Sequence, residues 1–327
     1  MHLVRQRLFW RWLLAVILLT ASFGLFSLHA QSKREPASRQ SRPLYVNLEQ
    51  ALDTLSHAEI AREEAALAGN QPTALDQARQ QCRTAIKQML KLDTQVDQLL
   101  RTTYTIRPSQ RKHTWTIKEL ESLVRNLKVQ IARGYRNQAL CYPDGSIDRI
   151  NSLSLALKQV NEVTRQPLAD ASVWQARVEQ AACLRFNNNT NQAAKLLAQW
   201  QTESPPANIA SRLLGEQIRL SLSTSDIESA LALSKTAEAQ ATIVPETAEA
   251  MLLTLLASQK FAEPTQTVEI LRRAQTQVGN IAKQHGHYWQ RRAESHLGHA
   301  MLTMLDSQDP TLLRLSLIHI SEPTRPY

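Results

Sequence analysis

The amino-acid sequence predicts an all-α protein in which antiparallel helical hairpins stack into a solenoid. Three observations predict this class: the composition, two long stripes of apolar residues at helical spacing, and a later series of shorter helix–turn–helix segments. Of the 327 residues, 43% are hydrophobic but only 5% are aromatic, with 8 Gly and 13 Pro. A β-sandwich or barrel would need more turn residues and more β-branched or aromatic strands. Ala, Leu, Gln, Glu, Lys and Arg dominate instead, and these residues lose little entropy in helices.

The N-terminal segment, residues 1–30, has the order of a secretory signal. Three arginines precede an uncharged apolar stretch from Trp12 to the small residue Ala30. Leu28 is large for a cleavage site and the stretch approaches membrane-spanning length, so an uncleaved anchor that contacts the membrane is the alternative. In both cases we expect the rest of the chain to be extracytoplasmic, either periplasmic or secreted. Residues 31–43 contain no large apolar side chain and predict a flexible tether.

Residues 44–166 predict a region of long helices. A stripe of eight apolar residues, alternately three and four apart, predicts one long helix with a coiled-coil seam, and a second seam follows a loop that contains Pro108. Two seamed helices joined by a short loop bury their stripes by folding back on each other, which predicts an antiparallel hairpin. Thr116 and Glu119 form a capping-box sequence before the second seam. Weaker stripes predict one helix before this hairpin and one after it. In chain order the four stripes are Leu48, Ala51, Leu55 and Ala58; Leu75, Ala78, Cys82, Ala85, Met89, Leu92, Val96 and Leu99; Ile117, Leu120, Val124, Leu127 and Ile131; and Ile147, Ile150, Leu157 and Val160.

Residues 167–314 predict an array of shorter helix pairs. Two helix–turn–helix units have the polar turns NNNTN and STSD, and a third unit follows them. Asp226 is placed to cap the second helix of the second unit, and Pro264 suits the first turn of the second helix of the third unit. A fourth unit begins near His287 and lacks its second helix, so we expect the solenoid to be truncated at the C-terminus.

This array, over residues 170–306, resembles the tetratricopeptide family of helix-pair repeats. Small residues stand at the two positions where paired helices touch, followed by a large apolar residue and a closing proline. The matching residues are Ala181, Ala193, Leu197 and Pro205 in the first unit, and Leu214, Gly215 and Ala230 in the second. Arg177 and Ser211 replace the first-helix tryptophan of the family, and the spacing from Gly215 to Ala230 is fifteen residues instead of twelve. The resemblance implies a curved stack of hairpins that binds other proteins.

The last segment, residues 315–327, does not suit the end of a solenoid, because LSLIHISEPTRPY provides no polar terminal helix. Read back into codons, Leu315 to Arg325 resembles in frame a transposase adapter used in preparing sequencing libraries. We therefore interpret 315–327 as a sequencing artefact and expect Arg314 to be about the last native residue. The native protein is then longer than the present chain.

No motif of a hydrolase, nucleotide-binding protein or metalloprotease occurs, so we predict that the region present is not an enzyme and holds no cofactor. The leading hypothesis is an exported, non-catalytic helical-repeat scaffold that mediates protein–protein interaction. If the helix-pair resemblance holds, the first helix of each unit faces a concave groove. Its arginines would then bind the acidic side chains or terminal carboxylate of a peptide, and the alternative is that they are ordinary exposed arginines. The groove candidates are Gln175, Val178, Arg185, Ile209, Arg212, Glu216 and Arg219.

Two further functions stay open. The first is that this chain is the accessory repeat region of a longer enzyme whose catalytic domain lies beyond Arg314. The second is binding to an anionic polymer or membrane surface through residues 101–136, which have nine Lys or Arg against two acidic residues within a chain of net charge +9. A solvated helix face is the simpler explanation of this basic segment. We expect no nucleic-acid partner.

The three cysteines and the late histidines suggest little chemistry. Cys82 and Cys183 lie on apolar helix faces and are expected to be buried, whereas Cys141 lies in a loop and is able to react; a Cys82–Cys141 bridge is an alternative. His296 and His299 lie three apart on one helix face, a spacing that two metal ligands can use, but no further ligand motif accompanies them. We therefore predict no metal site.

Overall fold

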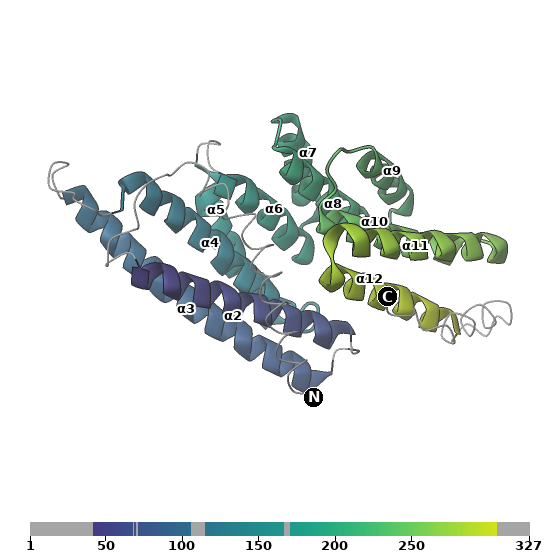
Figure 1. Cartoon of the computed structure of the whole chain (residues 1–327), viewed down its shortest axis with the longest axis horizontal. Helices are drawn as coiled ribbons and strands as arrows, with labels where there is room; N and C mark the ends of the chain where they lie inside the picture. The colour runs from purple at the N-terminus through teal and green to yellow at the C-terminus, as the bar shows by residue number, and fades with distance from the viewer. Residues whose placement is uncertain (1–41, 68, 70, 106–114, 167–170, 306–327) are drawn as a thin grey trace.

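The structure is a computed structural model that describes residues 42–305 except 68, 70, 106–114 and 167–170 (Figure 1). Throughout this described part the regular structure is helical and contains no strand, which confirms the all-α helical-repeat solenoid predicted from the sequence. The α-helices are α2 (Arg42–Leu67), α3 (Pro72–Thr105), α4 (Ile117–Ala139), α5 (Ile147–Thr164), α6 (Ala171–Phe186), α7 (Thr190–Thr202), α8 (Ala207–Ser223), α9 (Ile227–Glu238), α10 (Pro245–Ser258), α11 (Pro264–His285) and α12 (His287–Leu305). A short 3₁₀ helix, Gln259–Phe261, follows α10.

The helices form two layers. The even-numbered helices contact one another in succession from α2 to α12, and we call them the inner helices. Each odd-numbered helix packs against the inner helix before it and the inner helix after it. One inner layer therefore continues through the long helices and the shorter pairs, and the odd-numbered helices cover its outer side (Figure 1).

The predicted seams of the first hairpin form its core. The buried stripe residues of α2, α3 and α4, including Leu55, Met89 and Leu127, pack into one hydrophobic cluster. Leu99 was expected on the seam and is 41% exposed, whereas Leu100 packs against the cluster. A straight α-helix has 3.6 residues per turn and rotates slowly away from a 3.5-residue repeat, so the last position of a long seam leaves the contact face.

The stripe predicted for α5 is wrong at its start. Ile147 and Ile150 are 68% and 41% exposed, because they lie in the first turn of the helix, before its buried face begins. The buried face of α5 is instead formed by Ser152, Leu153, Ala156, Val160 and Val163.

The helix ends follow the sequence signals. Thr116 and Glu119 form the expected capping box at the start of α4. The carboxylate of Asp226 accepts a hydrogen bond from the backbone N–H of Ser229 at the start of α9. Pro264 occupies the first turn of α11, where a missing N–H leaves no hydrogen bond unmade.

The residues matched to helix-pair positions lie at contacts between neighbouring helices. Gly215 is the tightest of these contacts, because a Cβ atom built there would lie 2.7 Å from Thr247 Oγ1 and 3.1 Å from the Cα of Thr247 on α10. Pro205 is partly exposed in the turn between α7 and α8. The buried members of the set are Ala181, Ala193, Leu197, Leu214 and Ala230.

The stack of inner helices curves until its last member meets its first. The hydroxyl of Tyr288 donates a hydrogen bond to Glu63, and Arg292 forms an ion pair with the same carboxylate. These contacts bring the start of α12 beside the end of α2, 225 residues earlier in the chain (Figure 1). The superhelix is therefore closed by polar side chains.

Three sequence predictions fall outside the described residues: the signal or anchor at 1–30, the tether at 31–41 and the adapter-like segment at 315–327. The two remaining tether positions, 42 and 43, belong to α2. Among the described helices, none combines the length and apolar character needed to cross a bilayer.

Candidate functional site: a groove lined by the inner helices

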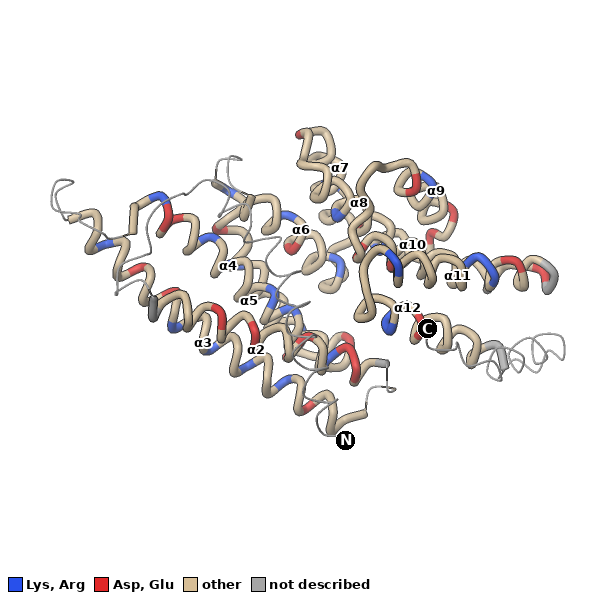
Figure 2. Tube along the Cα trace, viewed as in Figure 1, with Lys and Arg blue, Asp and Glu red and all other residues tan. Residues whose placement is uncertain are grey.

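The closed curve encloses a cavity of about 1640 Å³, which we call the groove. Side chains from every inner helix line it, together with the start of α3 and the turn after α4. Its volume exceeds the roughly 300–1,000 Å³ typical of small-molecule sites. Basic and acidic residues are interspersed along α2, α4 and α6 (Figure 2), so the lining does not have a single sign of charge.

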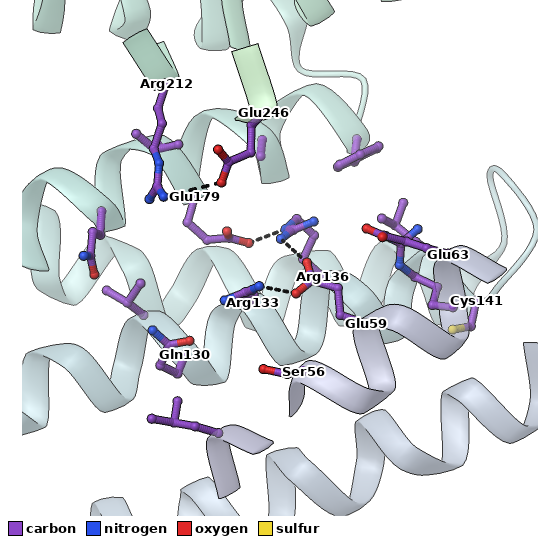
Figure 3. A pocket seen from close by; sticks show the side chains of 18 of the residues that line it. Ser56, Glu59, Glu63, Gln130, Arg133, Arg136, Cys141, Glu179, Arg212 and Glu246 are labelled. Atoms are coloured by element: carbon purple, nitrogen blue, oxygen red, sulfur yellow. Dashed lines mark hydrogen bonds and ion pairs between the residues drawn. The ribbon is translucent and has the colours of Figure 1, made fainter. Parts of the chain in front are cut away.

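Glu59 of α2 is the centre of the first group of ion pairs (Figure 3). It pairs with Arg133 and lies 3.8 Å from Arg136 Nη2, while Arg136 Nε donates to Glu179 of α6 at 2.5 Å. Burial alone would raise the pKa of Glu59, but Arg133, Arg136 and Arg62 outweigh it and lower the pKa to about 2. This carboxylate is therefore charged and joins α2, α4 and α6.

Glu216 of α8 is the centre of the second group. Arg185 of α6 and Arg219 of α8 each approach it at 3.1 Å. Burial would raise the pKa of Glu216, and the two arginines reverse this effect, so the pKa is lowered. Arg212 and Glu246 form a longer contact of 3.4 Å beside this group, and their side chains are 38% and 35% exposed (Figure 3).

Glu249 of α10 is the centre of the third group. Arg292 of α12 donates to both of its oxygens, at 2.8 and 2.9 Å, and Arg219 Nη2 lies 3.1 Å away. His296 Nε2 lies 3.1 Å from Glu249 Oε1. Against the effect of burial, His296, Arg292 and Arg219 lower the pKa of Glu249.

These groups form a belt of alternating carboxylates and guanidinium groups around the groove. Because Arg292 also pairs with Glu63, the belt passes from α12 back to α2. The belt joins each inner helix to the next. Its steps along α2 and α6 are made by the helices themselves, since α2 bears both Glu59 and Glu63 and α6 bears both Glu179 and Arg185. In chain order its members are Glu59, Glu63, Arg136, Glu179, Arg185, Glu216, Arg219, Glu249 and Arg292.

The structure brings most of the groove candidates together. Ile209 instead packs in the core around Trp174 and Leu197, so its placement in the groove was wrong. The candidates that line the groove are Gln175, Val178, Arg185, Arg212, Glu216 and Arg219. The three arginines are not free cations, because each has a carboxylate partner.

Sequence reasoning placed Glu216 in the groove but missed the two carboxylate partners on α10, Glu246 and Glu249. A signal was present, since Glu246 lies 34 residues after Arg212, one tetratricopeptide repeat length further along the chain. Continuing the count of groove positions into the third unit would have found it. Glu59 and Glu63 had no such signal, because they lie outside the region of resemblance.

Aromatic pairs lie at two places in the lining. Tyr45 and Trp115 have ring centroids 4.7 Å apart, and Tyr288 and Trp289 meet edge to face at 5.4 Å. Arg292 lies 4.9 Å from the centre of the Trp289 ring. These rings add apolar surface to a groove whose walls are otherwise rich in charge.

The basic segment 101–136 is less available than its sequence indicated. Lys128 pairs with Glu162 on α5, Arg133 pairs with Glu59, and Arg136 is held in the belt. Arg101 pairs with Asp97 at 2.8 Å. Residues 106–114 of the segment lie outside the described residues.

Neither the histidines nor the cysteines form a metal site in the described part of the chain, where no cluster of three ligand side chains occurs. His299 is exposed, whereas His296 contacts Glu249. Cys141 was expected in an open loop and is buried, as are Cys82 and Cys183. Its loop packs against α3, because Arg83 of that helix donates a hydrogen bond to Tyr142 at 3.1 Å.

Comparison with known proteins gives no match to a family model, to a curated protein or to a solved structure.

Proposed function

We propose that this chain is an exported, tetratricopeptide-like scaffold that binds a segment of another protein in its groove. The observation that supports the proposal best is the groove itself, which is larger than a small-molecule pocket and is lined by all six inner helices in the described part of the chain. Its wall offers hydrogen-bond donors and acceptors of both charges beside aromatic surface, which suits a peptide better than an apolar metabolite.

Arg212 and Glu246 are the groove residues best placed to bind such a segment. They form the most exposed and longest of the inner ion pairs that join α6 to α8 and α8 to α10. Arg212 Nε and Glu246 Oε2 are buried and have no hydrogen-bond partner in the protein. A bound peptide would instead contact the exposed part of each side chain, accepting a hydrogen bond from the Arg212 guanidinium group and donating one to the Glu246 carboxylate, without opening the belt.

Arg185 and Arg219 hold the groove in shape. Both pair with Glu216, whose side chain is only 10% exposed, and removal of either leaves a buried carboxylate with less compensation. A variant that replaces all three candidate arginines would thus test folding together with binding. A sharper experiment removes both partners of the exposed pair, Arg212 and Glu246, so that no charge is left alone.

The test is a pull-down from envelope extract with the full chain, followed by titration of the captured protein. We expect the Arg212→Ala/Glu246→Ala variant to bind at least tenfold more weakly than the wild type. The matched control is Arg272→Ala/Glu269→Ala, which removes an exposed ion pair, at 3.0 Å, from the outer helix α11. Unchanged affinity in the groove variant would remove the groove assignment, and equal loss in both variants would indicate a nonspecific charge effect.

The other two functions considered from the sequence, an accessory region of a longer enzyme and an anionic surface bound through 101–136, stay as predictions. The ion pairs of Lys128, Arg133 and Arg136 reduce the support for the second of them.

A further inference from the structure

Two of the three cysteines meet beside the groove. Cys82 of α3 has 0% of its surface exposed, and Cys141, just after α4, has 3%. Each thiol is the largest influence on the pKa of the other, which makes the two side chains neighbours. Cys141 Sγ donates a hydrogen bond to the backbone oxygen of Asn137 at 3.4 Å, and Cys141 belongs to the groove lining. Cys183 of α6 is also buried, but its hydrogen-bond partner is Glu179, at 3.8 Å.

Contacts made by neighbouring residues also bring α3 and the turn after α4 together near these two cysteines. Arg83 donates a hydrogen bond to the hydroxyl of Tyr142 at 3.1 Å, and Arg79 lies 5.0 Å from the centre of the same ring. Residues adjacent to Cys82 on α3 are therefore in contact with the residue after Cys141. Together with the packing of α3 against α4, these contacts hold the part of α3 that bears Cys82 against the turn that bears Cys141.

The two thiols have different reactivity. The neighbouring thiol of Cys82 lowers the pKa of Cys141, and Arg62 and Arg79 add to this effect against burial. The thiol of Cys141 and burial raise the pKa of Cys82. The thiolate is the nucleophilic form of cysteine, so Cys141 is the sulfur that reacts first and Cys82 is placed to resolve the product.

We propose that Cys82 and Cys141 form a peroxide-sensitive dithiol that closes to an intramolecular disulfide and ties α3 to the turn after α4. The thiolate of Cys141 attacks one oxygen of hydrogen peroxide, the O–O bond breaks, and hydroxide leaves with Cys141 as a sulfenic acid. The sulfur of Cys82 then attacks the sulfenic sulfur, the S–S bond forms, and the S–O bond breaks. Water leaves with the proton of Cys82. Both sulfur atoms are oxidised and one peroxide is reduced. The hydroxide takes up the proton that Cys141 released on forming its thiolate, which gives the second water.

This site is independent of the proposed peptide-binding function, and its chemistry needs only a peroxide that reaches the groove. An extracytoplasmic location, as expected from residues 1–30, would favour persistence of the disulfide. Closure would fix one wall of the groove, since Tyr142 and Arg79 also line it.

The experiment treats the purified full chain with hydrogen peroxide, blocks free thiols with a maleimide under denaturing conditions, and counts the labels by mass spectrometry. The wild type is expected to lose two of its three reactive thiols and to recover both with dithiothreitol. Peptide mapping should join Cys82 to Cys141 within one chain. The Cys183→Ala variant should lose the same two thiols, and Cys82→Ser should show Cys141 trapped by a sulfenic-acid reagent.

Three outcomes would overturn the proposal: a wild type that keeps all three thiols, a bridge that joins two chains, or a bridge that includes Cys183. Because the mapping is done on the wild type, it does not depend on the folding of any variant. Circular dichroism of Cys82→Ser confirms that its behaviour reports chemistry and not unfolding.

Discussion

The contact between α8 and α10 at Gly215 gives a sharp test of the packing. In Gly215→Ala, the new methyl group would lie 2.7 Å from Thr247 Oγ1 and 3.1 Å from the Cα of Thr247. The hydroxyl cannot simply turn away, because it donates a hydrogen bond of 2.7 Å to the backbone oxygen of Ser211. Since Thr247 has 0% of its surface exposed, relief requires α10 to move.

The expected change in the free energy of unfolding combines one stabilising effect with two destabilising effects. Alanine is favoured over glycine in a helix interior by about 1 kcal/mol. Overpacking of a tight contact costs about 1–3 kcal/mol. Loss of the hydrogen bond between Thr247 and Ser211 costs about 1 kcal/mol more. We therefore expect Gly215→Ala to lower the free energy of unfolding by about 1–3 kcal/mol.

The assay is urea denaturation followed by circular dichroism, with Gly298→Ala as the matched control. Gly298 is also helical, but a Cβ atom there meets nothing within 4 Å. That variant should therefore gain about 0.5–1 kcal/mol through helix propensity alone. If both variants gain stability to the same extent, the close approach of α8 and α10 is wrong. Partial rescue of Gly215→Ala by Thr247→Ala would identify the contact atom.

Three further predictions test other parts of the molecule. Because the folded-state pKa of Glu59 is about 2, below its ordinary 4.5, its charge stabilises the fold above pH 4.5 and that stability is lost as the pH falls toward 2. Acid titration should show this loss in the wild type and a flatter profile in Glu59→Gln; identical profiles would contradict the ion-pair assignment. Thr116→Ala should cost about 1 kcal/mol by removing a helix cap, whereas Thr94→Ala, inside α3, should not reproduce this loss in thermal melts. Leu252→Ala should cost about 2–5 kcal/mol because this side chain is fully buried, and Leu302→Ala, which is 56% exposed, should change stability by less than about 0.5 kcal/mol in urea titrations.

The fold was largely readable from the sequence because its stabilising contacts are periodic. Residues such as Met89 and Leu127 recur at helical spacing, and each helix buries its stripe against its neighbours in the chain. The errors occur where a stripe is extrapolated to the end of a helix. Leu99 and Ile147 have the right spacing, but no neighbouring helix covers them.

The site was less predictable than the fold. Counting along the repeats placed Arg185 and Arg219 in the groove, but their charge is compensated by Glu216 and Glu249. Arg292 reaches Glu63 only through the accumulated rotation of all the helices between them. No short stretch of sequence indicates how large that rotation is. The sequence therefore predicted the groove positions better than their electrostatic character.

The contact of Tyr288 and Arg292 with Glu63 has a consequence for the evolution and folding of this architecture. Open arrays fray from their ends and tolerate extra modules, because each module interacts only with its neighbours. Here an extra helix pair inserted between α2 and α12 would add rotation, so that Arg292 would no longer meet Glu63 and the two helices would separate. The number of modules between α2 and α12 is thus fixed by geometry, and melting of either helix is felt directly at the other.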